Sequence, residues 1–303
     1  MSPTINRTVL MSGVDYFDDQ QAINPFMNKA VVIDRDAAKR EHTLIKEALQ
    51  ETGVKVIQIS APKDCQDGVY TANWGLVRGN KAVMSRLPNA RKGEEPYAAE
   101  VLRDLGKEVI VLPDNFKKFS GQGDSLPCGN YLFAGSSYRS DPDAQAFVAK
   151  TLGYELIQLR AIPFRSFFGY HNNRFGWPAI NQSSGWRDSF YYDIDLALSV
   201  LKGPTETTKG LIAWCPAAFT PKSRRKIRSL TDVDKIEVSA QEATKAFACN
   251  LVSTGTHVIM NAGATNFASA LKKHGLKPIL LSNPELGKGG GSIRCTTLTL
   301  DNV

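Results

Sequence analysis

The chain of 303 residues is 42% hydrophobic and 22% charged, the composition of an ordinary globular protein with a sizeable core. Its net charge of +7 is mild, and its densest basic run, residues 222–228, lacks interleaved aromatic residues, which favours a solvated helix face over nucleic-acid binding. The five cysteines are widely spaced without a CxxC pair, which argues against a disulfide framework or a zinc site. No leader segment is recognised and no apolar run approaches the roughly 18 residues of a membrane span, so a cytoplasmic protein without a membrane partner is predicted.

One pattern of elements repeats five times along the chain: two strands, a helix and a third strand. The strands are predicted at 8–13, 30–34 and 54–60; 69–78, 81–86 and 108–112; 124–128, 131–136 and 155–159; 193–201, 211–214 and 235–238; and 248–253, 257–261 and 278–281. The helices are predicted at 35–51, 94–105, 143–152, 221–229 and 265–274. Residues 292–300 remain as a single strand, which is expected to return to the first unit and close a ring.

Each unit is too small to bury both faces of its sheet alone, so the five units have to pack around a shared axis. The predicted fold is therefore α/β, a five-bladed β/α propeller that forms one domain over residues 1–303. Its blades are predicted at 1–60 with the closing strand 292–300, 67–113, 124–160, 193–239 and 247–282. The long connection 159–188, rich in aromatic, Asn and Gly residues, and the segment 15–25 are candidate lids.

A cysteine follows a run of three glycines near the end of the chain. The glycines at 289–291 allow a ligand to approach the backbone closely, and Arg294 beside Cys295 is a positive neighbour that favours the thiolate. The predicted strand continues from there, so Cys295 is expected at the start of a rigid element. The alternative is that Cys295 is a buried small apolar residue at the end of a sheet.

Polar side chains gather at the predicted strand starts that face the shared axis. They are Asp67 with Asn73, Asp124, Asp193 with Asp195, Cys249 with Asn250, and Cys295. Acidic and amide groups that face one cysteine are costly to bury without a polar ligand. The pattern predicts a polar ligand site in a central channel.

Six stretches, taken together, resemble motifs of a known superfamily in the same order. They are YFD with INP at 16–25, DGVYTANW at 67–74, NARKGEE at 89–95, FSGQGD at 119–124, DIDLALS at 193–199 and GGGSIRC at 289–295. They resemble the guanidino-group-modifying superfamily, the penteins, which includes amidinotransferases, arginine deiminases and dimethylarginine dimethylaminohydrolases. The resemblance covers nearly the whole chain and implies a five-bladed β/α propeller that needs no metal or organic cofactor.

The resemblance also implies catalytic roles. Cys295 would be the nucleophile that attacks the guanidinium carbon and forms a covalent thiouronium-type intermediate. Asp195 and Asp124 would hold the planar cation through paired carboxylate oxygens.

Substrate-binding roles are implied for a second group of residues. Asn73 matches a position where the family places an acid or an amide against the substrate, and Asp67 and Asp18 lie in matching motifs. Arg91 and Arg139 match arginines that grip a substrate carboxylate. For both arginines a purely structural salt bridge remains the alternative.

Two positions depart from the family pattern. Asp193 stands where the family has the histidine of a His-x-Asp pair, and Ser120 stands where it has an acid. A histidine base contributes about 10² to 10⁴ in rate, so a hydrolase needs a replacement. Asp193 carries protons itself, with a pKa raised by neighbouring carboxylates, or His171 moves in from the long connection, or the protein binds guanidino compounds without reacting with them.

The predicted function is C–N hydrolysis or amidino transfer on a small cationic, guanidine-like compound through Cys295. The alternative is a catalytically silent binding protein or sensor for such compounds. A nucleic-acid-binding module is a distant third reading, and no nucleic-acid partner is predicted. An exposed outer strand or helix could form a symmetric homodimer.

Overall fold

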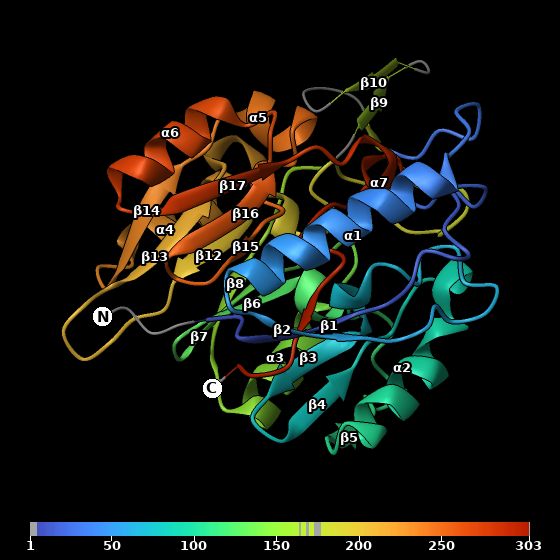
Figure 1. Cartoon of the computed structure of the whole chain (residues 1–303), viewed down its shortest axis with the longest axis horizontal. Coiled ribbons are helices and arrows are strands. Elements are labelled where there is room, and N and C mark those ends of the chain that lie inside the picture. The colour runs from blue at the N-terminus through green and yellow to red at the C-terminus, as the bar shows by residue number, and fades with distance from the viewer. Residues whose placement is uncertain (1–4, 164, 168–169, 173–176, 303) are drawn as a thin grey trace.

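The computed structural model describes residues 5–163, 165–167, 170–172 and 177–302, with the backbone alone for 165–167, 170–172 and 178. Five three-stranded sheets among these residues share one pairing pattern, in which the central strand pairs antiparallel with one neighbour and parallel with the other (Figure 1). The strands, sheet by sheet, are β18 (Leu298–Thr299), β1 (Thr8–Met11) and β2 (Lys55–Gln58); β3 (Gly75–Arg78), β4 (Lys81–Met84) and β5 (Glu108–Ile110); β6 (Ser125–Cys128), β7 (Tyr131–Gly135) and β8 (Glu155–Leu159); β12 (Leu198–Lys202), β13 (Gly210–Trp214) and β14 (Val233–Glu237); and β15 (Val252–Ser253), β16 (His257–Asn261) and β17 (Lys277–Leu281).

A helix connects the central strand of each sheet to its parallel neighbour, because parallel strands need a crossover connection. The five helices are α1 (Arg35–Glu51), α2 (Glu94–Asp104), α3 (Pro142–Leu152), α4 (Pro221–Ser229) and α6 (Thr265–Lys273). Asp34 caps α1 by accepting the N–H of Ala37, and Thr220 caps α4 by accepting that of Ser223. All five predicted helices are confirmed, whereas the short helices α5 (Ala240–Lys245) and α7 (Pro284–Lys288) were not predicted.

The prediction of a strand at 30–34 is wrong. The side chain of Asn28 accepts the N–H of Ala30 and its carbonyl accepts that of Val31, which folds the segment into a turn. Val31 and Val32 are 42% and 84% exposed, so their side chains are not part of a sheet face. The central strand of this sheet is β1 itself, which pairs with β18 on one side and with β2 on the other.

The last predicted strand, 292–300, is only partly confirmed, because Leu298–Thr299 alone is a strand. Residues 293–296 form a turn, and the hydroxyls of Thr296 and Thr297 each donate to the carbonyl three residues earlier, at 2.9 Å. Such local bonds compete with strand pairing. Cys295 therefore lies in a turn before the strand, while the antiparallel pairing of β18 with β1 confirms that the segment returns to the first unit.

The connection 159–188 contains a small additional sheet that was not predicted. Its strands are β10 (Tyr170–Asn172), β9 (Arg165–Phe167) and β11 (Trp177–Pro178), paired antiparallel in that order. The side chains of β9 and β10 lie outside the described part of the structure. The prediction that this connection is a lid therefore stays a prediction.

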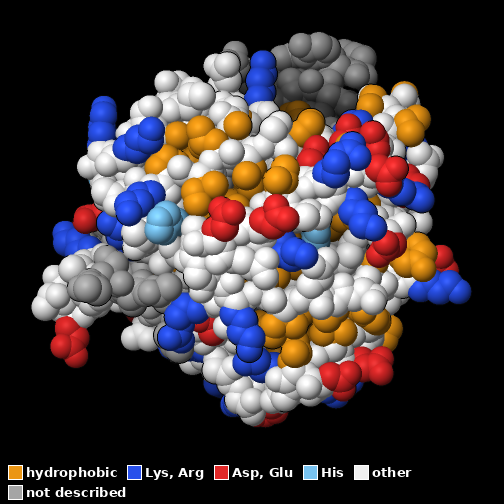
Figure 2. Space-filling model, viewed as in Figure 1, with side chains coloured by type: hydrophobic (Ala, Val, Ile, Leu, Met, Phe, Trp, Pro, Cys, Tyr) orange, Lys and Arg blue, Asp and Glu red, His pale blue; other side chains and the backbone are white. Residues whose placement is uncertain are grey.

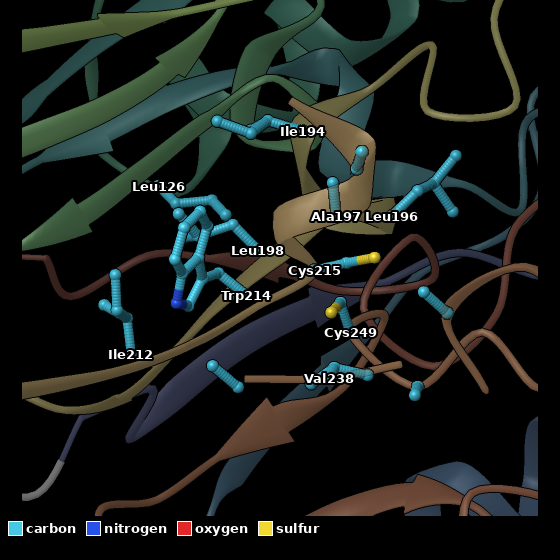
Figure 3. Packing of buried hydrophobic residues seen from close by; sticks show 14 of the residues in the cluster. Leu126, Ile194, Leu196, Ala197, Leu198, Ile212, Trp214, Cys215, Val238 and Cys249 are labelled. Carbon is cyan, nitrogen blue, oxygen red and sulfur yellow. The ribbon is translucent and has the colours of Figure 1, made fainter. Parts of the chain in front are cut away.

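Four buried apolar clusters join the five sheets to one another. The largest joins the sheets of β7, β13 and β16, and the others join the sheets of β1 and β16, of β1 and β4, and of β4 and β7. Figure 3 shows part of the largest cluster, where Trp214 packs near Leu126, Leu198 and Ile212. Each sheet is thus packed against the next in a cyclic order.

No helix in the described part of the chain is long and apolar enough to cross a membrane. The basic residues 222–228 lie on α4, whose side chains are mostly exposed. On the molecular face of Figure 2, Lys and Arg side chains are scattered among acidic and neutral ones.

A buried histidine gives the fold a testable pH dependence. His42 on α1 is 3% exposed, its Nε2 has no described partner, and burial lowers its pKa to about 4. The unfolded chain takes up a proton near pH 6.5 while the folded chain does not, so this group destabilises the fold as the pH falls from 6.5 toward 4. When the pH falls from 7.5 to 5, His42 should lower the free energy of unfolding by about 2 kcal/mol.

We expect His42→Leu to remove this loss. Urea unfolding at pH 7.5 and 5.0 checks it, because the free energy of unfolding should change less with pH in His42→Leu than in the unaltered chain. Equal pH dependence in both proteins would contradict the assignment.

Candidate functional site

Each of the five sheets is entered through a turn that precedes its antiparallel outer strand. The turns are η1 (Thr71–Trp74) before β3, η3 (Gly121–Gly123) before β6, η4 (Ile194–Leu196) before β12, and residues 248–250 and 293–296 before β15 and β18. The predicted polar residues lie in or beside these turns: Asn73, Asp124, Asp193, Asp195, Asn250 and Cys295. Contacts between η1 and η3, and between η3 and η4, bring the residues of different sheets together.

Cys295 is held by residues from two other sheets. Its Sγ accepts a hydrogen bond from Asn250 Nδ2 at 3.1 Å and donates to Asp195 Oδ2 at 3.4 Å. Asn250 Oδ1 accepts the backbone N–H of Cys295 at 3.2 Å, so this amide fixes both the turn and the sulfur. Burial, and then the charges of Asp195 and Asp193, raise the pKa of the Cys295 thiol well above its usual value. This shift favours the protonated thiol form of Cys295.

Cys295 faces a cavity of about 20 Å³, which we call the cysteine cavity. Its lining includes four predicted residues besides Asp193 and Cys295, namely Asp67, Asn73, Arg91 and Arg139, and it also includes Ile23, Asn24, Tyr70, Ser120 and Tyr192. This volume has room for about one water molecule. A guanidino compound would have to displace part of the wall on entering.

Asp193 is the carboxylate that lines this cavity beside the cysteine. Its Oδ2 accepts a hydrogen bond from Asn73 Nδ2 at 2.7 Å, and its Oδ1 has no described partner. Burial raises the pKa of Asp193, although the charge of Arg139 and hydrogen bonds from Ser120 and Asn73 oppose the shift. Asp193 is thus suited to hold a proton at a higher pH than an exposed carboxylate does.

Asp195 and Asp124 lie behind the cavity wall. Asp195 contacts the Cys295 sulfur, and burial followed by the charge of Asp193 raises the pKa of Asp195 well above its usual range. Asp124 Oδ1 accepts the N–H of Ile194 at 3.1 Å, so it holds the turn between Asp193 and Asp195. Asp124 does not line the cavity, so its predicted contact with a substrate stays a prediction.

The two arginines differ in how far they are already paired. Arg91 makes a bidentate pair with Glu94, at 2.8 Å from Nε and 2.7 Å from Nη2, and donates from Nη1 to Asn73 Oδ1 at 2.7 Å. The structural salt bridge left open for Arg91 is therefore present. Arg139 makes none of the described ion pairs; it donates to the carbonyl of Ile23, and its Nη1 has no described partner although the residue is buried.

The two remaining predicted acids are in different places. Asp67 lines the cysteine cavity, and burial raises its pKa to about 6. Asp18 does not line this cavity, because it pairs with Arg35 at 2.9 Å and accepts the backbone N–H groups of Asp19 and Gln20 in a surface turn. The expectation that Asp18 contacts the substrate is therefore not supported by its position.

Three residues that hold the glycine run were not recognised as site residues. The hydroxyls of Tyr70 and Tyr192 donate to the carbonyls of Leu286 and Gly290, at 2.6 and 2.7 Å, and Asn24 Nδ2 donates to that of Gly289 at 2.9 Å. In sequence, buried tyrosines look like ordinary core residues. The run itself needs glycine, since Gly290 has a φ of +89° and a Cβ on residue 291 would lie 2.8 Å from that of Cys295.

None of the described residues that line the cysteine cavity is a histidine. His171 lies on β10, and its side chain is outside the described part of the structure. Among the described residues no group of His, Cys, Asp and Glu could hold a metal ion.

Several known proteins with related sequences or folds are named as enzymes of arginine or dimethylarginine. N(G),N(G)-dimethylarginine dimethylaminohydrolase of Mycobacterium tuberculosis is 28% identical over 295 residues, 97% of this chain and 86% of that protein. The bifunctional arginine dihydrolase/ornithine cyclodeaminase AgrE of Nostoc sp. is 30% identical over 293 residues; these are 95% of this chain but 37% of that protein, so the chain spans just over a third of its length. The substrate-bound N-terminal domain of the cyanobacterial arginine dihydrolase ArgZ has a TM-score of 0.81 at 27% identity, covering 97% of this chain and 98% of that domain.

These similarities, with the fold and the cysteine cavity, define a protein of the guanidino-group-modifying superfamily, as the six motifs predicted. The profile of one family matches residues 16–177, more than half of the chain. The chain belongs to that family, described as N,N dimethylarginine dimethylhydrolase, eukaryotic.

The raised pKa of Asp67 predicts that this carboxylate opposes folding at neutral pH. Its pKa is about 6 in the folded chain and 3.8 in the reference state, so the folded chain binds the proton more tightly and loses stability as the pH rises toward 6 and above. We expect Asp67→Asn to be more stable than the unaltered chain at pH 7.5, with an advantage about 2 kcal/mol larger than at pH 4.5.

Urea denaturation at the two pH values measures this difference. Asp104→Asn, which changes an exposed acid on α2, is the control and should show no such dependence. A pH-independent effect of Asp67→Asn would contradict the predicted ionisation.

Proposed function

We propose that the protein hydrolyses a C–N bond of a guanidino or amidine compound with Cys295 as the nucleophile. The observation that carries this proposal is the cysteine cavity, which both Cys295 and Asp193 line, while Asp193 Oδ1 has no described partner. A nucleophile and a proton carrier on one cavity are the two groups that such a reaction needs. Relatives named as an arginine dihydrolase and a dimethylarginine dimethylaminohydrolase support the same reaction class.

The proposed fold is a five-bladed β/α propeller with the cysteine cavity on its axis. The cyclic packing of the five sheets supports this arrangement, as do the contacts of β12 with both β6 and β15 and of β18 with β3. In such a ring the five entry turns point toward one centre. This would explain why polar residues from all five sheets meet around Cys295.

The proposed substrate is a small cation of the arginine type that also carries a carboxylate. Asp193 and Asp67 supply carboxylate oxygens for guanidinium or ammonium N–H groups. Arg139 supplies a buried guanidinium that makes no ion pair with any described residue, and a substrate carboxylate would satisfy its Nη1, which has no described partner. Arg91 is already paired with Glu94, so its proposed task is to position Asn73.

The proposed reaction begins when the bound cation lowers the pKa values of the thiol and of Asp195, so that Asp195 is ionised. The proton of Cys295 passes to Asp195 Oδ2, and Sγ forms a bond to the guanidinium carbon. The C–N bond then breaks, and Asp193 donates its proton to the leaving amine. Water, deprotonated by Asp193, attacks the same carbon; the C–S bond breaks, and the sulfur recovers its proton from Asp195. The protonated urea passes its extra proton to the released amine, so the products are a urea and an ammonium ion.

Cys295→Ala should abolish turnover and covalent labelling. Intact-protein mass spectrometry after incubation with arginine, methylarginines, agmatine and guanidinoacetate should show an adduct or a product with the unaltered chain only. Cys128→Ala, which removes a cysteine on β6, is the matched control. A product formed by Cys295→Ala would overturn the nucleophile assignment, and binding without any product would favour a silent receptor.

Asp193→Asn should lower turnover by at least about 100-fold, because an amide cannot donate the proton that the leaving amine needs. Substrate affinity should change only a few-fold, since the amide has the shape and charge of the protonated acid. Stopped assays for turnover and calorimetry for affinity separate the two effects, with Asp114→Asn as a surface control. An active Asp193→Asn variant would instead direct attention to His171.

A further inference from the structure

Arg139 is held by two aromatic rings rather than by a salt bridge. Its guanidinium carbon Cζ lies 5.0 Å from the ring centroid of Tyr192 and 5.7 Å from that of Trp186. A cation over the face of an aromatic ring is attracted by the ring's quadrupole, most strongly when the ring is the indole of tryptophan. The hydrogen bond described for this guanidinium goes to the carbonyl of Ile23. The two rings therefore help to fix where the guanidinium lies.

Arg91 shows the other way of holding a buried arginine. Its Nε and Nη2 donate to Glu94 and its Nη1 donates to Asn73, so the protein itself uses the edge of this guanidinium. An acid neutralises the charge of an arginine and occupies its N–H groups, whereas an aromatic ring contacts the planar face and leaves the edge to another partner. Arg139 is held in the second way and makes none of the described ion pairs.

The two acids that line the cysteine cavity are close enough to Arg139 to be affected by its charge. Burial raises the pKa values of Asp193 and Asp67, and the charge of Arg139 opposes both shifts. No ion pair of Arg139 with either acid is described among the salt bridges of the chain. The guanidinium is thus held near both carboxylates without being neutralised by contact with one of them.

A second cation contacts the same indole. Lys118 Nζ lies 4.7 Å from the ring centroid of Trp186. Burial lowers the pKa of Lys118; Asp141 opposes this shift, while the charges of Arg139 and Arg187 add to it. The indole therefore attracts two cations that repel each other, and its loss would leave that repulsion without the attraction that offsets it.

Trp186 lies in a turn of the connection 159–188. The backbone N–H of Asn181 donates to the carbonyl of Trp186 at 2.9 Å, and the N–H of Trp186 donates to Ser184 Oγ at 3.2 Å. Asn181 Nδ2 also donates to the carbonyl of Ala22 at 3.1 Å, which ties the turn to the segment at the cavity wall. Trp186 is not among the residues that line the cysteine cavity, so any effect on a ligand there passes through Arg139.

We propose that Trp186 is a positioning residue that gives the cysteine cavity a preference for substrates with a carboxylate. Because the indole holds Arg139 through the face of its guanidinium, the charge and the N–H groups at the edge stay available to a carboxylate. The preference rests on the proposed function, in which Arg139 is the partner of the substrate carboxylate. The hold of Trp186 on Arg139 in the ligand-free protein does not depend on it.

The first test compares arginine with agmatine, which has the same guanidinium group and chain but no carboxylate. Calorimetry on Cys295→Ala gives both affinities without turnover. In this background we expect Trp186→Leu to lower the affinity for arginine about 3- to 30-fold and to change that for agmatine less than about twofold. Trp186→Phe, which keeps an aromatic face, should retain most of the preference. Arg139→Met, which removes the guanidinium, should abolish it.

Trp177→Leu is the matched control, because it removes an indole on the same connection that is 75% exposed. It should leave the ratio of the two affinities unchanged. Trp186→Gln should behave like Trp186→Leu and keeps the test decisive if the leucine variant fails to fold. Equal losses for arginine and agmatine would show a merely structural role and overturn the proposal, as would an unchanged ratio.

The second test needs no ligand. Nitrogen-15 relaxation of Arg139 Nε, with its signal identified by its absence in Arg139→Met, reports how rigidly the guanidinium is held. We expect a high order parameter in the unaltered chain and in Trp177→Leu, and a lower one in Trp186→Leu and Trp186→Gln. Equal order in all four proteins would overturn the positioning role. If Cys295→Ala binds neither arginine nor agmatine, the proposed substrate is contradicted, and this second measurement alone decides the role of Trp186.

Discussion

The burial of three neighbouring carboxylates is the constraint on which the site depends. Burial raises the pKa of Asp124, Asp193 and Asp195, and the charge of Asp193 adds to the shifts of Asp124 and Asp195. Two buried guanidinium groups oppose this, since Arg139 lowers the pKa of Asp193 and Arg294 that of Asp195. Neither arginine forms a described ion pair, so the carboxylates keep free oxygens. The site therefore holds protons that a bound cation can release.

The orientation of one amide decides which oxygen of Asp193 holds its proton. Arg91 can only donate, so Asn73 must turn its Oδ1 toward Arg91 and its Nδ2 toward Asp193. Asp193 Oδ2 then has to accept, which leaves the proton for Oδ1, the atom without a partner. Glu94 fixes Arg91 through two hydrogen bonds. A salt bridge that contacts no substrate thus orients the acid of the proposed reaction.

Much of the fold could be predicted because its helices carry local signals. The caps Asp34 and Thr220 mark the starts of α1 and α4, and the crossover pattern follows from the order of strands and helices. The turn at Cys295 was predicted as a strand, because β-branched threonines favour strands unless their hydroxyls bond the local backbone, as Thr296 does here. Whether this segment forms a strand or a turn also depends on residues from distant parts of the chain that pack against it.

The site residues also divide into those that local sequence indicates and those that depend on contacts between distant parts of the chain. Asp193 and Cys295 were predicted from motifs to share one site, and both line the cysteine cavity. Arg91 and Glu94 lie three residues apart in the sequence, so their salt bridge could have been recognised from that spacing. The pairing of Asp18 with Arg35 could not, because nothing in their spacing indicates contact. Tyr70 and Tyr192 hold the backbone beside Cys295 through the carbonyls of Leu286 and Gly290, and the sequence does not show that these distant groups meet.

The pairing of β1 with β18 has a consequence for how the site assembles. It joins segments from opposite ends of the chain, and the nearby bond from the Thr8 N–H to Asp301 spans 293 positions. Contacts of such long range close a very large loop and form late in folding. Cys295 lies three residues before β18, so its sulfur reaches Asn250 and Asp195 only when this strand pair forms. Short strand pairs are among the segments that can open locally in a folded protein, and such an opening here would carry Cys295 away from both partners.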